Sequence, residues 1–181
     1  MSEVRLETER LILRMFREDD FEAYARIFGD PDVARYLSGR PLERWEAWRH
    51  MAFVLGHWAL RGYGLWAVEE RSSGRLVGRV GLHYPDGWPG LEVGWALGRE
   101  DWGKGYATES ARPALAYAFT EIGCVHVISL IQPANVASIK VAERLGERLE
   151  GKTELFGKEV LVYGIDRESW QRDRSTRRTD G

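Results

Sequence analysis

The chain has 181 residues, which is enough for one domain with a sizeable hydrophobic core. Its hydrophobic content of 44% and charged content of 30% are ordinary for a soluble globular protein, and a net charge of −2 gives no general reason to expect a nucleic acid or a membrane as partner. A single cysteine, Cys124, excludes an internal disulfide framework. No signal-peptide pattern opens the sequence, and no apolar run approaches the ~18 residues that span a bilayer. We therefore expect a cytoplasmic protein.

The first half of the chain is predicted to hold a strand, three helical segments and then three strands. Asp19 or Asp20 can cap the first helix, and Gly62 closes the longest one. Turn sequences rich in Ser, Pro, Asp and Gly separate the strands. The expected order is a strand over 11–16, a helix ending near Gly29, a helical turn from Pro31, a helix over 41–60, and strands over 65–70, 76–84 and 91–97.

The second half is predicted to continue the alternation. The expected order is a helix to about Glu121, a buried strand over 125–131, a short helix capped by Asn135 and ended by Gly146, and a hairpin of strands over 148–154 and 159–166. The sequence contains no internal repeat and no linker. These elements predict a single α/β domain over residues 1–170, followed by a polar, disordered tail over 171–181.

One stretch, from Glu92 to Glu109, is chemically informative. An apolar strand leads into Gly103 and Gly105, and a helical pattern follows. Glycines at a helix start leave backbone N–H groups open to an anion, and the helix dipole favours negative charge there. The alternative is a tight turn without a ligand. A P-loop is excluded because its GK[ST] ending is absent, and Thr108 occupies the place of the third glycine in a dinucleotide fingerprint.

Three motifs in order carry a family resemblance over roughly residues 5–170: LETERLILRMFREDD at the start, WGKGYATES in the glycine loop, and NVASIKVAERLG after the buried strand. The chain resembles the GNAT superfamily of acyl-CoA-dependent N-acyltransferases, and within it the RimJ/RimL-type ribosomal-protein N-terminal acetyltransferases. The resemblance implies a mixed, mostly antiparallel sheet of about 6–7 strands, splayed at the cofactor site and flanked by helices.

The chain departs from the family pattern at two positions. Trp102 stands where the superfamily loop begins with Gln or Arg, a place whose side chain is not needed for binding through backbone N–H groups. Glu147 stands where the family usually has Phe after Leu-Gly. This change removes an aromatic side chain from the end of the second motif, so the family pattern does not predict how the residues pack there.

The resemblance implies acetyl-CoA as co-substrate and no metal. Backbone N–H groups of the glycine loop would hold its pyrophosphate, the edge of the preceding strand would pair with the pantetheine arm, and an N–H near Trp95–Leu97 would polarise the thioester. Lys104 is either a phosphate contact or a solvated side chain. The implied cofactor-binding residues are Trp95, Ala96, Leu97, Trp102, Gly103, Lys104, Gly105, Tyr106, Ala107, Thr108, Asn135, Ser138 and Lys140.

Acyl transfer to an amine also needs a base and a proton for the leaving thiolate. Glu92 is the candidate base, its alternative being an exposed glutamate at a strand end. Ser138 or Tyr163 is the candidate acid; Ser138 is equally compatible with helix capping, and Tyr163 with the core. His50 and His57 fall on the long helix, where a surface position is the default.

The implied function is transfer of an acetyl group to a primary amine of a small molecule or a protein N-terminus. Trp45, Trp48 and Trp88 lie in segments that flank the acceptor in this fold, or serve packing alone. The alternative is a non-catalytic acyl-CoA-binding sensor or regulatory module on the same fold. No direct nucleic-acid binding is expected, because acidic residues interrupt the basic C-terminal segment. The resemblance also implies a homodimer.

Overall fold

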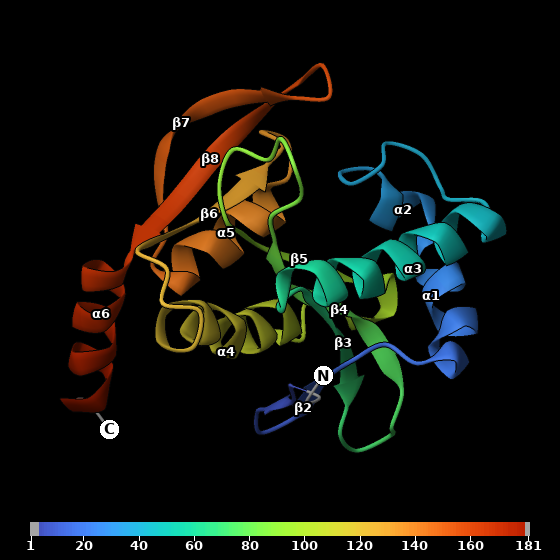
Figure 1. Ribbon diagram of the computed structural model, residues 1–181, viewed down its shortest axis with the longest axis horizontal. Coiled ribbons are helices and arrows are strands. Elements are labelled where there is room, and N and C mark those ends of the chain that lie inside the picture. The colour runs from blue at the N-terminus through green and yellow to red at the C-terminus, as the bar shows by residue number, and fades with distance from the viewer. Residues whose placement is uncertain (1–3, 180–181) are drawn as a thin grey trace.

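The computed structural model describes residues 4–179, which form one sheet covered by helices (Figure 1). The strands are β1 (Leu6–Glu7), β2 (Leu11–Arg14), β3 (Leu65–Glu70), β4 (Leu76–His83), β5 (Glu92–Leu97), β6 (His126–Ile131), β7 (Arg148–Leu155) and β8 (Lys158–Asp166). The helices are α1 (Phe21–Phe28), α2 (Pro31–Ala34), α3 (Arg44–Arg61), α4 (Tyr106–Thr120), α5 (Val136–Leu145) and α6 (Arg167–Thr179), with short 3-10 turns at Glu18–Asp20 and Arg99–Asp101.

The sheet has eight strands in the order β1-β2-β3-β4-β5-β6-β8-β7. Every neighbouring pair is antiparallel except β5 and β6, which run parallel. The predicted mixed, mostly antiparallel sheet is therefore confirmed. The strand beyond the expected number is β1, whose two residues are too few to leave a periodic pattern in the sequence.

Helices lie on both faces of the sheet. Arg79 of β4 lies over the Phe28 ring of α1 and is the register partner of Ala96, so Ala96 faces α1. Trp95 points to the other face because side chains alternate along a strand, and it reaches Ser138 of α5. On that second face α4 packs against β4 and β5, and α5 packs against β6. The central strands are thus buried on both sides, and Val80 and Val93 are fully covered.

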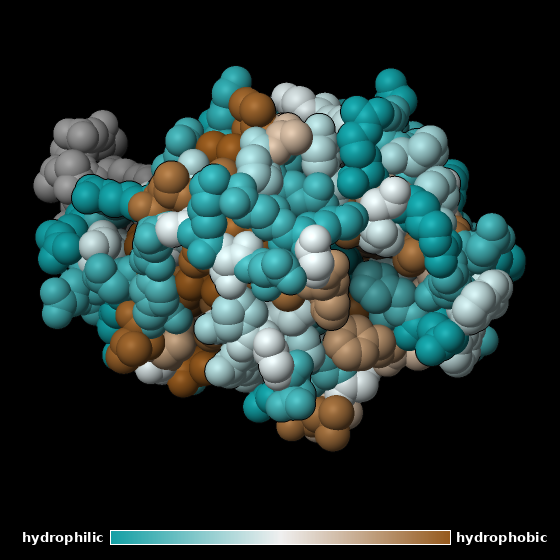
Figure 2. All heavy atoms as spheres, turned by 90° about the horizontal axis from the view of Figure 1, so that it is seen from above, coloured by the Kyte–Doolittle hydropathy of each residue, from teal (hydrophilic) through white to brown (hydrophobic). Residues whose placement is uncertain are grey.

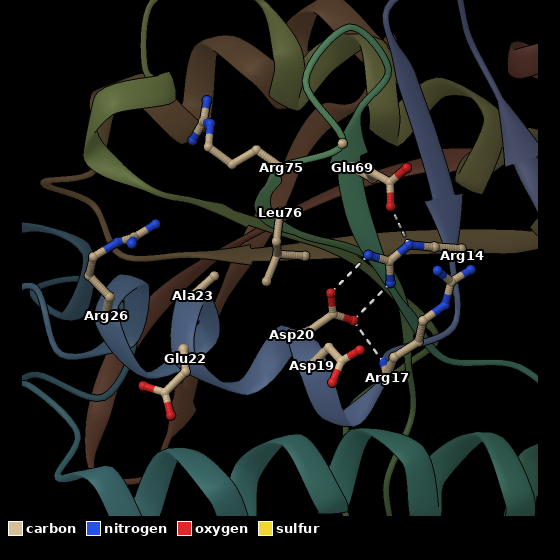
Figure 3. A pocket seen from close by; sticks show the side chains of 11 residues that line it. Arg14, Arg17, Asp19, Asp20, Glu22, Ala23, Arg26, Glu69, Arg75 and Leu76 are labelled. Atoms are coloured by element: carbon tan, nitrogen blue, oxygen red, sulfur yellow. Dashed lines mark hydrogen bonds and ion pairs between the residues drawn. The ribbon is translucent and has the colours of Figure 1, made fainter.

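Two residues of the opening motif, Arg14 and Asp20, form a buried ion pair that stabilises the fold. Arg14 at the end of β2 is only 4% exposed, and its guanidinium donates to both carboxylate oxygens of Asp20, each at 2.8 Å, and to Glu69 at 2.6 Å (Figure 3). Asp20 also accepts from the Arg17 N–H at 2.7 Å. A solvent-open hollow beside this cluster is lined by Arg14, Asp20 and Arg75, and none of the predicted site residues lines it.

The C-terminal segment differs from the sequence prediction. The sequence predicts a disordered tail from residue 171, whereas α6 continues through Thr179; residues 180–181 lie outside the described part of the chain. Trp170 anchors the start of this helix, with its ring 5.0 Å from that of Phe119. None of the helices in the described residues is both long and apolar enough to span a membrane.

Candidate active site

The glycine loop forms a backbone cradle at the start of α4. Gly103 and Gly105 have φ of 76° and 82°, a left-handed conformation that side-chain-bearing residues adopt with strain. A Cβ on Gly103 would have no atom within 4 Å, so its backbone is open to approach. Among residues 4–179, no acceptor takes a hydrogen bond from the backbone N–H groups of residues 103–108. Converging free donors at a helix N-terminus fit a pyrophosphate.

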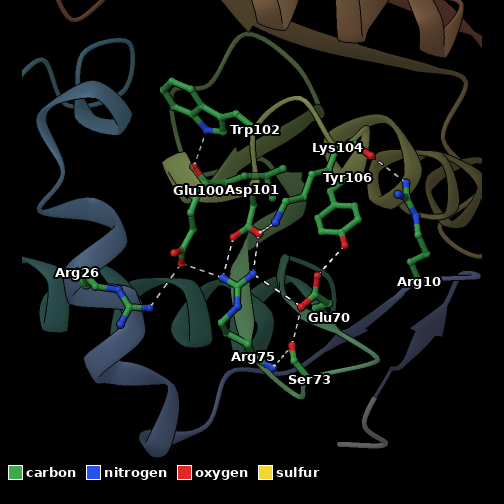
Figure 4. A network of polar contacts seen from close by, with 11 residues as sticks. Arg10, Arg26, Glu70, Ser73, Arg75, Glu100, Asp101, Trp102, Lys104 and Tyr106 are labelled. Carbon is green, nitrogen blue, oxygen red and sulfur yellow. Dashed lines mark hydrogen bonds and ion pairs between the residues drawn. The ribbon is translucent and has the colours of Figure 1, made fainter.

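A polar network lies beneath this cradle (Figure 4). The buried Asp101 carboxylate accepts from Arg75 at 2.7 and 2.9 Å and from Lys104 Nζ at 2.9 Å. Burial by itself raises the pKa of Asp101, but the hydrogen bonds from these two cations outweigh it, and the pKa lies below its usual value. The Asp101 carboxylate therefore neutralises part of the charge of Lys104, whose side chain is still 42% exposed beside the loop.

Residues from the opening motif, which were not among the predicted site residues, hold the glycine loop in place. Thr8 Oγ1 and Arg10 Nε each donate to Glu109 of α4 at 2.7 Å. A second guanidinium nitrogen of Arg10 donates to the Lys104 carbonyl at 3.0 Å. Thr8 and Arg10 belong to the opening motif and Glu109 to the loop motif, so their joint presence in the sequence was the available signal.

Next to the cradle, β5 and β6 part into a fork. Glu92 and Ile128 are their only register pair in the described residues, and the Ile128 N–H donates to the Leu91 carbonyl at 2.9 Å. A continuing parallel ladder would next join the Leu130 N–H to the Val93 carbonyl. Two side chains replace this bond.

The Ser129 hydroxyl donates to the Val93 carbonyl at 2.8 Å. The Leu130 N–H points to Glu92 Oε1, at 3.5 Å. Every second residue of β5 turns its backbone N–H and C=O toward β6, as Leu91 and Val93 do. Trp95 is the next residue in this series, so its backbone groups face the fork. An extended, amide-bearing chain can therefore lie along β5 as an added strand.

The second motif lies on the α5 side of this fork. Asn135 caps α5 as predicted, accepting from the Ser138 N–H at 3.2 Å. Ser138 Oγ accepts from the Trp95 indole at 3.3 Å. Tyr163 is buried in a small cluster against which Trp95 also packs. Lys140 is exposed, and no described residue pairs with it.

The candidate base Glu92 lies on the opposite, α3 side of β5. Its register partner His83 stacks on His57 of α3. The Trp88 indole donates to Glu92 Oε2 at 2.7 Å. Burial raises the pKa of Glu92 to about 7, against the lowering effect of its hydrogen bonds and of Arg79. Glu92 is thus a held, half-buried carboxyl rather than an exposed glutamate at a strand end.

The histidines on α3 differ from the prediction of a surface position. His57 is buried, and its two nitrogens contact the Tyr63 carbonyl at 2.9 Å and the Tyr84 N–H at 3.1 Å, an arrangement that fits the neutral ring. His50 Nδ1 and the Tyr24 hydroxyl form a hydrogen bond of 2.9 Å. Burial, with Arg79 nearby, lowers the pKa of His50 to about 3 and that of His83 to about 4.

The aromatic residues near the acceptor side have different environments. Trp88 lies against Glu92, whereas Trp45 and Trp48 on α3 are exposed. The ring of Phe156, at the tip of the β7–β8 hairpin, lies 5.9 Å from that of Trp88. Viewed from the end that carries this hairpin, hydrophobic side chains are interspersed among hydrophilic ones (Figure 2). Among the side chains that the structure describes, no group of His, Cys, Asp and Glu is arranged to hold a metal ion.

Comparison with known proteins agrees with this geometry. A family model described as "Acetyltransferase (GNAT) domain" matches residues 10–148. The chain is 32% identical over 171 residues to the uncharacterized protein YkkB of Bacillus subtilis (strain 168), an alignment that covers 90% of this chain and 95% of that protein. It is 29% identical over 148 residues to the uncharacterized N-acetyltransferase p20 of Bacillus licheniformis, covering 81% and 83% of the two chains.

A solved structure shares the whole architecture. The crystal structure of an acetyltransferase from Agrobacterium tumefaciens str. C58 superposes with a TM-score of 0.82 at 29% identity, covering 92% of this chain and 96% of that one. The family match spans both the glycine loop and the fork. The cradle, the parted strands and these relatives together establish that the chain belongs to the GNAT family of acetyltransferases.

Proposed function

We propose that the protein transfers an acetyl group from acetyl-CoA to a primary amine. The observation that carries this proposal is the pairing of two features along β5: a fork whose edge is open to an extended chain, and a cradle of free N–H groups where the next helix begins. A cofactor with an amide-bearing arm and a pyrophosphate needs both features, in that order.

In this proposal the cofactor supplies an acetyl thioester. Residues 103–108 hold the pyrophosphate through backbone N–H groups, and Lys104 adds positive charge beside it. The backbone groups of Trp95 and the N–H of Leu97 offer the edge of β5 to the arm. Ala96 lies between them with its backbone groups turned toward β4, and the Leu97 carbonyl already accepts from the Trp102 indole at 3.0 Å. Asn135 and Ser138 approach from α5, and the exposed Lys140 lies on the same helix.

Glu92 serves as the base. The attacking amine must lose a proton to expose its lone pair, and a carboxylate with a pKa of about 7 is partly ionised and strong enough to accept that proton near neutral pH. Trp88 fixes its orientation. Ser138 or Tyr163, on the other side of β5, returns a proton to the departing sulfur.

The acceptor is a primary amine of a small molecule or of a protein N-terminus. Resemblance to the RimJ/RimL type supports protein N-termini among the acceptors. The same resemblance supports a homodimer, and light scattering would measure the oligomeric state. The lone Cys124 supports a reducing cytoplasm as the place of action.

The first test is thermal unfolding with acetyl-CoA, CoA or NAD. A ligand at 100 times its Kd adds about 2.7 kcal/mol, which raises Tm by about 5–10 °C for a domain of this size. We expect this rise with acetyl-CoA and CoA and no rise with NAD. A panel of amines, with release of free CoA thiol as the readout, then identifies the acceptor. No shift at saturating acetyl-CoA contradicts the proposal; a shift without turnover on any amine favours a sensor.

A further inference from the structure

Glu147, the residue that replaces the family's usual Phe, carries a buried carboxyl group beside the fork. It is 3% exposed, and it follows Gly146 at the end of α5. Its Oε1 lies 3.1 Å from Ser129 Oγ, whereas Oε2 has no hydrogen-bond partner in the described residues. An isolated buried carboxylate would be costly, so its protonation state needs a physical account.

The protonation state of Glu147 follows from the hydrogen available at Ser129. The hydroxyl has one hydrogen, and its shorter contact, 2.8 Å to the Val93 carbonyl, uses it. The contact between Ser129 Oγ and Glu147 Oε1 then needs a hydrogen from the carboxyl, which must be protonated. Burial, with smaller contributions from the charges of Glu92 and Glu150, raises the pKa of Glu147 to about 8, against the lowering effect of the Ser129 contact.

The charged groups around Glu147 come from three strands and from α6, whose Asp173 lies against the neighbouring Gly146. Glu92 approaches from β5, and Glu150 from β7. Glu150 is itself paired with His126 of β6 at 2.8 Å. No cation among the described residues donates to either Glu147 oxygen, so this environment favours the neutral acid.

We propose that Glu147 is a positioning residue: as a neutral acid it fixes the Ser129 hydroxyl on the Val93 carbonyl and so keeps the fork open for acyl-CoA. This role rests on the acetyltransferase function proposed above. Without the Ser129 bond, the Val93 carbonyl is free to accept the Leu130 N–H, and the two strands can close by one step at the place where the cofactor arm must enter.

The test compares Ser129→Ala, Glu147→Leu and Glu147→Gln with Glu143→Gln, an exposed control on α5. CoA affinity is measured by calorimetry. Loss of one buried hydrogen bond corresponds to an affinity loss of about 10-fold, which we expect for Ser129→Ala and Glu147→Leu. Glu147→Gln keeps a neutral donor of the same shape and should bind CoA as the unmodified protein does.

A second readout uses the free protein, so that failure of the proposed function and failure of this inference can be told apart. Closing of the fork should slow hydrogen exchange of the Leu130 amide in Ser129→Ala and Glu147→Leu, and leave it unchanged in both Gln variants. If the unmodified protein binds no CoA, the proposed function fails, and hydrogen exchange of the Leu130 amide alone tests the role of Glu147. Unchanged affinity and exchange in Ser129→Ala and Glu147→Leu, or a loss in Glu147→Gln as large as in Glu147→Leu, would overturn the positioning role.

Discussion

Replacing Glu147 with Gln should change how the free energy of unfolding depends on pH. In the unfolded chain this carboxyl ionises near its ordinary value of 4.5, whereas in the folded protein burial raises its pKa to about 8. Between these values the folded state holds a proton that the unfolded state has lost. The stability associated with Glu147 is therefore fully present below pH 4.5 and is lost as pH rises toward 8.

The magnitude follows from the separation of the two pKa values. One bound proton changes the free energy of unfolding by about 1.4 kcal/mol per pH unit, so the separation corresponds to about 5 kcal/mol in total. Because Gln does not titrate, the Glu147→Gln variant should gain about 4 kcal/mol relative to the unmodified protein between pH 5 and pH 8. Glu92 also has a raised pKa, but it titrates in both proteins and largely cancels in the difference.

Urea unfolding followed by tryptophan fluorescence at pH 5, 6, 7 and 8 measures this difference. The chain has 8 Trp residues, several of them buried, so the signal reports on the core. The control Glu143→Gln removes an exposed carboxyl from the same helix and should give a curve parallel to that of the unmodified protein. If Glu147→Gln also runs parallel, Glu147 is ionised like an ordinary carboxylate and the reasoning about its protonation is refuted.

Three further predictions concern the site itself. Glu92→Gln should lower kcat by about 10²–10⁴-fold, abolish the rise of kcat/KM through pH 7 and leave the Kd of acetyl-CoA unchanged; rate profiles across pH 5–9 and calorimetry check this. Asp101→Asn removes the buried carboxylate that accepts from Arg75 and Lys104, while Arg75 keeps Glu100 as a partner. It should lower the free energy of unfolding by about 1–3 kcal/mol in urea titrations, and an unchanged midpoint would argue against it. Gly94→Ala places a Cβ 3.7 Å from Glu92 Oε1 and near no other residue, so it should leave Tm unchanged and lower kcat/KM by crowding the candidate base. In the control Gly151→Ala the added Cβ has no atom within 4 Å, and both quantities should stay unchanged.

The sequence predicts most of the fold because its signals are local. Helix periodicity with a following left-handed glycine delimits α3, which ends before Gly62, and Asn135 and Gly146 delimit α5 as expected. The two-residue β1 and the polar α6 leave no comparable signal, and the structure differs from the prediction there.

The site is predicted less completely, because its function depends on contacts between distant segments. Thr8 hydrogen-bonds to Glu109, which is 101 residues away in the sequence. Ser129 contacts both Val93 and Glu147. Nothing in the local sequence indicates that Glu147 points inward. The roles of Glu92, Ser138 and Tyr163 in catalysis stay predictions, although the fold places Glu92 on one face of β5 and the other two near Trp95 on the opposite face.

The fork also has a mechanical consequence. The sheet consists of two halves, β1 to β5 and β6 to β8, and within the described residues a single register pair and the Ser129 hydroxyl join their backbones. A cofactor lying along β5 would act as a removable strand that completes the sheet across this joint. Binding should therefore stiffen the β7–β8 hairpin, which belongs to the half opposite the glycine loop. The ligand would become part of the architecture for as long as it remains bound.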